Sequence, residues 1–131
     1  MKTLEGKKIA VVGLAASGRA AARLALERGG EVHVSDLRTD PAAHAGGAEL
    51  RRLGADVDLG EHPLARIALA ETVVVSPGIP PDAPVLRELS RRDIRWVSEP
   101  EFAFRFFDGP LIAVTGTNGK TTTAALVAHL L

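Results

Sequence analysis

Short runs of β-branched residues alternate along the chain with segments rich in alanine and arginine. The first run, Lys8–Val12, is apolar without polar alternation, which is typical of a strand buried on both faces of a sheet. Five further strands are predicted, at residues 31–35, 55–59, 72–76, 94–98 and 111–115. Helices are predicted at residues 18–29, 48–53, 64–70, 83–92, 99–107 and 122–131. This alternation predicts an α/β fold with a parallel sheet and helices on both faces.

Turn-forming residues separate the predicted helices and strands. Ser17 is predicted to cap the first helix, and the pair Gly29-Gly30 is predicted to end it. Residues 37–47 are predicted to form a loop, because Pro41 and Gly46-Gly47 interrupt regular structure.

The composition argues against several classes of function. The 16 Lys and Arg residues balance 16 Asp and Glu residues, and this zero net charge argues against a nucleic-acid partner. The absence of cysteine excludes disulfides, a thiol nucleophile and thiolate metal sites. The longest apolar stretch, residues 9–16, is too short to span a bilayer, and no secretory signal is visible. We therefore expect no membrane partner and a cytoplasmic location.

The turn after the first strand is a candidate anion site. Gly13-Leu14-Ala15-Ala16-Ser17-Gly18 keeps the outer glycines of the dinucleotide fingerprint G-x-G-x-x-G but has Ala15 at the middle position. The middle glycine lets the backbone approach a pyrophosphate closely, so Ala15 argues against an ordinary dinucleotide site. Free N–H groups at the start of a helix still suit an anion. The alternative is a tight turn without a ligand.

Two more candidate positions follow predicted strands. Asp36 closes the second strand, where an acid can bind ribose hydroxyls or read a base edge. The alternative is a cap for the next turn, and in either case we expect a solvated carboxylate at the surface. The segment Ser76-Pro77-Gly78-Ile79-Pro80-Pro81 follows the strongest strand, where open α/β sheets bind ligands. Gly78 is free there to take a positive φ. The alternative is a stiff connection.

The segment from Thr115 to Thr122 carries the most specific motif. Its Gly119-Lys120-Thr121 matches the end of a P-loop, whose amides cradle phosphates, whose lysine reaches the terminal ones and whose hydroxyl holds Mg²⁺. The first glycine of the usual pattern would fall at Val114, so the usual pattern fails there. The alternative is a glycine turn with a solvated lysine.

The phenylalanine cluster and the histidines do not indicate a stacking surface or a metal site. Phe102, Phe104, Phe106 and Phe107 are predicted to serve core or interdomain packing, because no basic cluster accompanies them as in a base-stacking surface. The four histidines show no metal-ligand spacing.

Several of these segments resemble one family, the Mur ligases. Gly116–Thr122 resembles the family's ATP-binding loop, a short form that lacks the first P-loop glycine. Residues 13–18, 34–36 and 75–80 resemble the D-glutamate-adding branch, and residues 99–104 fit the entry to its second domain. The resemblance covers essentially the whole chain.

The resemblance implies a fold and an activity. Residues 1–98 would form a Rossmann-like domain that binds a UDP-sugar, and residues 99–131 the first strand, P-loop and helix of a truncated central ATP-binding domain. The longer protein would be an ATP-dependent ligase of peptidoglycan synthesis that adds D-glutamate to UDP-N-acetylmuramoyl-L-alanine through an acyl phosphate. The D-glutamate site would lie outside this chain, which alone would be inactive.

The resemblance also implies roles for individual residues. Lys120 would be catalytic, holding the β- and γ-phosphates, and Thr121 would bind Mg²⁺. ATP would be bound by Gly116, Thr117, Asn118, Gly119, Lys120, Thr121 and Thr122. The UDP-sugar would be bound by Ala15, Ala16, Ser17, Asp36, Leu37, Arg38, Ser76, Pro77 and Gly78. Asp36, Leu37 and Arg38 would surround the uracil.

Three alternatives stay open at this point. The chain could be a free-standing nucleotide-binding or regulatory domain without catalysis of its own. It could belong to the L-alanine-adding ligases, whose first loop is normally richer in glycine than Gly13–Gly18. An NAD-dependent oxidoreductase is disfavoured by Ala15 and by the ATP loop.

Overall fold

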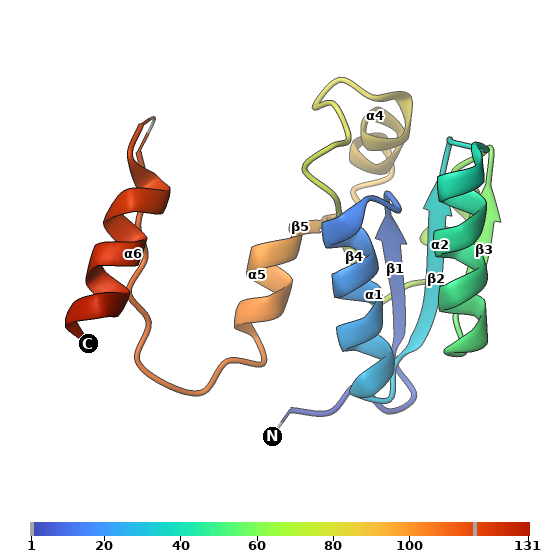
Figure 1. The fold of residues 1–131 in the computed structure, drawn as a ribbon. Coiled ribbons are helices and arrows are strands. Elements are labelled where there is room, and N and C mark those ends of the chain that lie inside the picture. The colour runs from blue at the N-terminus through green and yellow to red at the C-terminus, as the bar shows by residue number, and fades with distance from the viewer. Residues whose placement is uncertain (1, 117) are drawn as a thin grey trace.

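The computed structural model describes residues 2–116 and 118–131. Within them, five parallel strands form a sheet in the order β3-β2-β1-β4-β5 (Figure 1). These strands are β1 (Lys8–Val12), β2 (Glu31–Asp36), β3 (Asp56–Leu59), β4 (Thr72–Val75) and β5 (Val97–Ser98). Because β1 pairs with β2 on one side and with β4 on the other, the strand order reverses at β1. The predicted parallel α/β architecture is confirmed.

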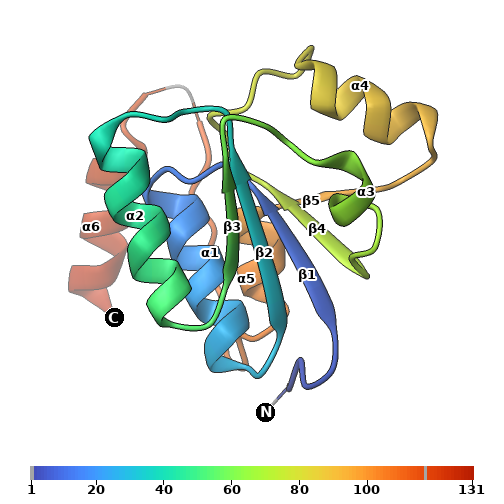
Figure 2. The same cartoon turned by 90° about the vertical axis from the view of Figure 1, so that its right-hand side faces the viewer.

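Helices cover both faces of the sheet (Figure 2). One face packs against α1 (Ala16–Glu27), α2 (Pro41–Arg52) and α5 (Glu99–Phe104), and the other against α3 (Leu64–Ile67) and α4 (Pro84–Arg91). Successive residues of β1 enter the two cores in turn, with Ile9 and Val11 on the α1 face and Ala10 and Val12 on the α4 face. This double burial explains why the β1 sequence is apolar at consecutive positions.

The predicted loop at residues 37–47 is wrong, because α2 begins at Pro41. Proline is well tolerated in the first helical turn, and Asp40 caps the helix by accepting the Ala43 N–H at 2.8 Å. The two glycines lie inside the helix for a packing reason. A Cβ on Gly46 would lie 3.1 Å from Arg19 Cδ, and one on Gly47 would lie 3.2 Å from Val57 Cγ1. The glycines let α2 approach α1 and β3 closely.

The bounds of other elements also differ from the prediction, among them those of α1 and β5. Helix α1 begins at Ala16, and its N-cap is Ala15, which offers no side-chain acceptor. The prediction that Ser17 caps this helix is therefore wrong. Strand β5 is reduced to Val97–Ser98, while Ile94 and Trp96 pack against the α4-side core instead.

The aromatic cluster divides into a pair that packs on the core, buried Phe102 and partly buried Phe106, and an exposed pair. Phe102 is fully buried and makes an edge-to-face contact with Phe106 at a centroid distance of 5.2 Å. Phe104 and Phe107 are about half exposed, at 53% and 51%. Core packing is confirmed for the first pair, and interdomain packing of the second pair stays a prediction.

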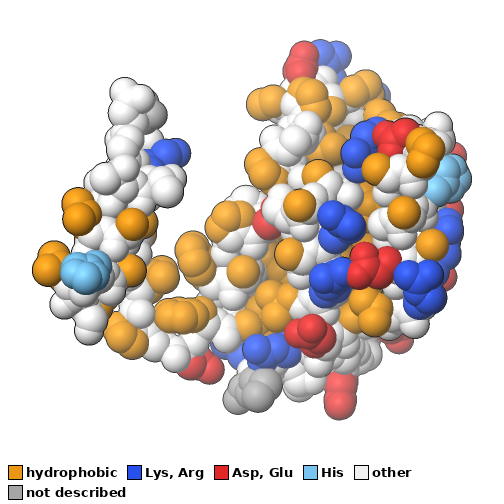
Figure 3. Space-filling view, viewed as in Figure 1, with side chains coloured by type: hydrophobic (Ala, Val, Ile, Leu, Met, Phe, Trp, Pro, Cys, Tyr) orange, Lys and Arg blue, Asp and Glu red, His pale blue; other side chains and the backbone are white. Residues whose placement is uncertain are grey.

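The predicted strand at residues 111–115 is wrong. The segment finds no neighbouring strand among the residues described, and a strand exists only through hydrogen bonds to another strand. The helix predicted after it is confirmed as α6 (Lys120–Leu130), although none of its 11 residues, all of them described, is buried. Hydrophobic side chains are exposed over α6 and the segment leading to it (Figure 3). In the described parts of the chain, no helix has the length and apolarity needed to cross a bilayer.

We expect the segment from residue 110 onward to open far more readily than the sheet. Amide hydrogens of α6 should exchange orders of magnitude faster than those of β1 and β4, because almost no buried contact resists opening of α6. Hydrogen exchange measured by mass spectrometry checks this. Equal protection of α6 and β1 would contradict the expectation.

Candidate functional site

The turn between β1 and α1 lies at the carboxyl edge of the sheet, where the strand order reverses. Ligands of open α/β sheets bind at this position. A hydrogen bond of 2.7 Å from the Leu14 N–H to Asp36 Oδ2 connects the turn to β2. Gly13 N–H also donates to the Ser35 carbonyl at 2.8 Å. The end of β2 therefore fixes the path of the turn.

Two positions of this turn must be glycine, because neighbouring atoms lie too close to leave room for a side chain. Gly13 has a φ of +107°, and a Cβ there would lie 2.6 Å from Ser76 Cβ. A Cβ on Gly18 would lie 2.1 Å from the Gly13 carbonyl oxygen. No side chain fits at either position, so the first and last residues of the motif close the turn on itself.

The middle of the turn presents an exposed helix N-terminus. Ala15, Ala16 and Ser17 are exposed, and the first turn of α1 carries neither a capping side chain nor an acidic residue. Its first N–H groups have no acceptor within the helix, because the intrahelical bonds begin with Arg19 N–H to the Ala15 carbonyl. Such N–H groups and the helix dipole favour a phosphate or another anion.

Asp36 is a buried structural carboxylate, and our expectation of a solvated surface acid is wrong. The residue is 7% exposed, and Oδ1 accepts the Arg38 backbone N–H at 2.8 Å. The Arg38 guanidinium adds two longer contacts, both at 3.3 Å. Burial alone would raise the pKa of Asp36, but the N–H groups of Arg38 and Leu14 and the Arg38 guanidinium outweigh it and leave the pKa lowered.

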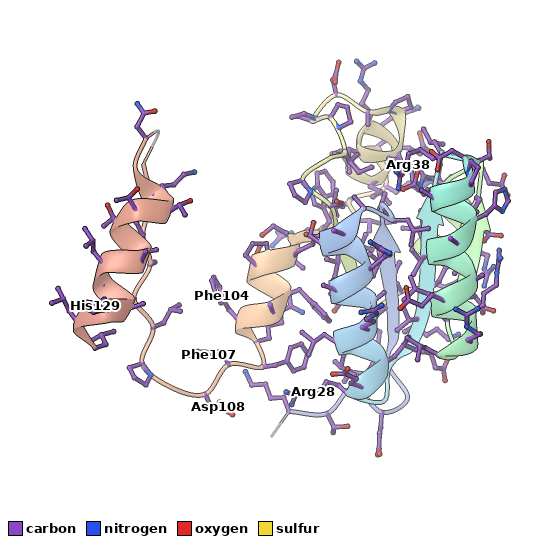
Figure 4. All side chains as sticks on the ribbon, viewed as in Figure 1. Arg28, Arg38, Phe104, Phe107, Asp108 and His129 are labelled. Carbon is purple, nitrogen blue, oxygen red and sulfur yellow. The ribbon has the colours of Figure 1, made fainter. Side chains whose placement is uncertain are left out.

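An apolar cavity opens beside the end of β2. It is lined by Leu37, His62, Ile79 and Pro80 among others. The cavity therefore lies between Leu37, a predicted uracil contact, and the loop after β4. The Leu37 side chain is 61% exposed, and Arg38 lies at the same edge of the sheet (Figure 4). His62 Nδ1 lies 2.8 Å from Ser35 Oγ, and desolvation lowers its pKa despite the opposing charge of Asp36. His62 was not predicted from the sequence, because a lone histidine after a weak strand gives no signal.

The loop after β4 meets the turn directly. Ser76 is 2% exposed, and its Oγ has no hydrogen-bond partner among the described residues. Pro77 and Gly78 are exposed at the same edge. Gly78 does not adopt the positive φ that was expected. The predicted sugar-binding residues 15–17, 36–38 and 76–78 thus lie on three neighbouring strand ends.

Glu99 is a further residue at this edge that the sequence analysis did not select. It begins α5, is 7% exposed, and leaves Oε1 without a partner in the described chain. Glu99 directly follows β5, as Ser76 directly follows β4, and no local sequence pattern reveals that these two strands are paired.

The predicted ATP-binding loop lies on a separate part of the chain, before α6 (Figure 1). Gly119, with a φ of +75°, is the N-cap of α6, and Gly116 has a φ of +151°. Lys120, Thr121 and Thr122 occupy the first helical turn and are exposed, as is Asn118. Thr117 lies outside the described residues. Free amides, a lysine and a hydroxyl at one helix start fit a phosphate chain with Mg²⁺.

Comparison with known proteins points to one family. A family model described as "Mur ligase MurD-like, N-terminal domain" matches residues 7–98. The UDP-N-acetylmuramoylalanine–D-glutamate ligase of Desulfatibacillum aliphaticivorans is 41% identical over 98% of this chain and 28% of that protein. The enzyme of the same name from Trichlorobacter lovleyi is 43% identical over 97% of this chain and 28% of that protein. The chain spans about 28% of the length of these relatives.

Solved structures give the same family. A murein peptide ligase from Psychrobacter arcticus is 26% identical with a TM-score of 0.68, over 94% of this chain and 26% of that one. The UDP-N-acetylmuramate–alanine ligase of Thermotoga maritima is 26% identical with a TM-score of 0.62, over 95% of this chain and 29% of that one. A precorrin-2 dehydrogenase, 13% identical with a TM-score of 0.56, shares the fold alone.

We expect Asp36→Ala to destabilise the chain by about 1–3 kcal/mol, because it leaves the buried Leu14 N–H unpaired. Asp82→Ala, an exposed control, should change stability by less than about 0.5 kcal/mol. Because the folded-state pKa of Asp36 is lowered, its contribution is present at neutral pH and is lost as the pH falls through the acidic range. Urea unfolding at pH 7 and at progressively lower pH measures both effects. Equal stability of Asp36→Ala and Asp82→Ala at pH 7 would refute the structural role of Asp36.

Proposed function

The chain belongs to the Mur ligase family, with a MurD-like N-terminal domain, and on that basis we propose that it is the UDP-sugar-binding part of a D-glutamate-adding ligase. The complete enzyme would use ATP to join D-glutamate to UDP-N-acetylmuramoyl-L-alanine in peptidoglycan synthesis, in the cytoplasm. The observation that carries this proposal is the turn of residues 13–18, held by Asp36 at the point where the strand order reverses.

In this proposal the diphosphate binds at the start of α1. The N–H groups of the exposed residues Ala15, Ala16 and Ser17 would donate hydrogen bonds to the diphosphate oxygens, without any lysine in the turn. Ser76, Pro77 and Gly78 would contact the sugar from the adjacent strand end. Ala15 replaces a glycine of the dinucleotide fingerprint, which is consistent with a ligand other than NAD.

The uracil would lie among Asp36, Leu37 and Arg38. A carboxylate offers about four acceptor positions, and the Leu14 N–H, the Arg38 N–H and two guanidinium contacts of Arg38 use those of Asp36. We therefore propose that the Arg38 guanidinium, which is 46% exposed, turns away when the uracil binds. This movement would release an Asp36 oxygen for the uracil N3–H and place the guanidinium near the ligand.

We further propose that residues 1–98 form the UDP-sugar domain and residues 99–131 begin the ATP-binding domain. ATP would supply the phosphoryl group that activates the substrate carboxylate. Lys120 would hold the terminal phosphates, Thr121 would bind Mg²⁺ through its hydroxyl, and the amides from Gly116 to Thr122 would cradle the phosphate chain. No residue of this chain is assigned to D-glutamate.

Calorimetric titration of the chain with UDP-N-acetylmuramoyl-L-alanine tests the proposed function. We expect saturable binding of this ligand, weaker binding of UDP-N-acetylmuramate, and no binding of NAD. Binding of NAD without binding of the UDP-sugar would contradict the proposal. Tighter binding of UDP-N-acetylmuramate would favour an L-alanine-adding ligase instead.

Arg38→Ala should weaken UDP-sugar binding about five- to tenfold, because a loss of about 1.4 kcal/mol corresponds to tenfold in affinity. Arg52→Ala is the matched control, since Arg52 is also exposed but ends α2, near the amino ends of the strands. Arg52→Ala should keep the wild-type melting temperature, and Arg38→Ala should lower it only slightly, because the Arg38 side chain that contacts Asp36 is about half exposed. The same affinity for both variants would exclude Arg38 from the site.

We expect no substrate-dependent ATP hydrolysis by the 131-residue chain. Phosphoryl transfer needs several positioned groups besides a phosphate loop, and here the helix after that loop is exposed along its length. Phosphate release should stay at the level of a Lys120→Ala variant. Release that exceeds this control and depends on the UDP-sugar would contradict the expectation.

A further inference from the structure

Glu99 buries a carboxylate oxygen, Oε1, that the fold does not use. The residue is 7% exposed, and no donor of the described chain lies within hydrogen-bond distance of Oε1. Burying a carboxylate is costly unless hydrogen bonds or a cation replace the lost water. Because buried polar atoms are nearly always paired, an unpaired one suggests a partner that the chain itself does not contain.

A second unpaired polar atom follows the neighbouring strand. Strands β4 and β5 pair Val74 with Val97 and Val75 with Ser98, and Ser76 and Glu99 are the residues that directly follow these last paired positions. Ser76 is 2% exposed, and its Oγ also lacks a partner among the residues described. Two unpaired polar groups therefore end neighbouring strands at the carboxyl edge.

Both groups border the turn of residues 13–18. The Cβ position of Gly13 lies 3.4 Å from Ser76 Oγ, and that of Gly18 lies 3.6 Å from Glu99 Oε1. Glu99 also lines a groove between α1 and α5 together with Ser17, Ala20 and Pro100. A ligand at the start of α1 would thus lie close to both groups.

No local hydrogen bond or ion pair explains why the Glu99 side chain is buried. The N-cap of α5 is Ser98, whose Oγ accepts the Glu101 N–H at 3.3 Å, so Glu99 does not cap its own helix. Glu99 takes part in none of the ion pairs found in the part of the chain that the structure describes.

A carboxylate oxygen accepts hydrogen bonds, so the partner that Glu99 Oε1 lacks is a donor. A phosphate offers no donor and would be repelled, whereas a sugar offers hydroxyl groups and, when acetylated on nitrogen, an amide N–H. We propose that Glu99 is a substrate-binding residue that accepts a hydrogen bond from a hydroxyl or amide N–H of the sugar in the UDP-sugar. This inference rests on the proposed function and adds the group that distinguishes a UDP-sugar from UDP.

Calorimetric titrations of Glu99→Gln with UDP-N-acetylmuramoyl-L-alanine and with UDP test the inference. The variant should bind the UDP-sugar about tenfold more weakly than the wild type, as expected for one lost hydrogen bond to a charged acceptor. It should bind UDP with unchanged affinity. Glu101→Gln is the matched control on the same helix, because Glu101 is exposed, and it should bind both ligands like the wild type.

The other outcomes overturn the inference. Unchanged affinity of Glu99→Gln for both ligands excludes a contact, and equal weakening for both assigns Glu99 to the shape of the turn. Each titration is repeated with Mg²⁺ and with EDTA, and weakening that appears only with Mg²⁺ shows that Glu99 binds a cation instead. Failure of the wild type to bind the UDP-sugar refutes the proposed function itself, and this inference with it.

Thermal unfolding of Glu99→Gln separates binding from folding. Replacing an unpaired buried charge by a neutral amide should leave the melting temperature unchanged or raise it. A lower melting temperature together with weaker binding of both ligands would show a structural role and overturn the inference.

Discussion

The hydrogen bond from the Leu14 N–H to Asp36 determines the shape of the candidate site. It joins the end of β2 to the turn after β1, at the place where the strand order reverses. With the turn fixed there, Gly13 lies against Ser76 and Gly18 lies against the Gly13 carbonyl, so neither position accepts a side chain. The start of α1 is thereby held with residues 15–17 exposed and with no side chain capping its first N–H groups. One buried carboxylate thus positions an anion site without contributing to it directly.

The carboxyl edge combines strong internal pairing with unpaired polar groups. Asp36 uses both carboxyl oxygens within the fold, whereas Ser76 Oγ and Glu99 Oε1 have no partner among the described residues. The first arrangement stabilises the turn, and the second costs stability that a bound ligand would restore. Asp36 thus builds the turn and, in the proposed function, frees an oxygen for the uracil only when Arg38 turns away, whereas Ser76 and Glu99 keep an oxygen unpaired already. Binding sites commonly break local rules of packing for function in this way.

The sequence predicted the sheet well because doubly buried strands leave an unmistakable apolar pattern, as in Lys8–Val12. The sequence patterns gave wrong predictions where the structure of a residue depends on contacts with distant parts of the chain. Gly46 and Gly47 suggested a loop but serve close helix packing, and residues 111–115 have strand-forming composition but no strand to pair with. The positions of Asp36 and Ser76 were predicted from strand ends. The burial of Asp36 and the role of Glu99 depend on strand register and tertiary contacts, which local patterns do not encode.

In the proposed function, the carboxyl edge of this sheet binds a UDP-sugar at the start of α1. A nuclear magnetic resonance titration of the ¹⁵N-labelled chain with UDP-N-acetylmuramoyl-L-alanine observes each backbone N–H separately. We expect the amide signals of Ala15, Ala16 and Ser17 to shift in a saturable manner while that of Lys120 does not. Shifts confined to residues 118–122, or no saturable shift at residues 15–17, would contradict it.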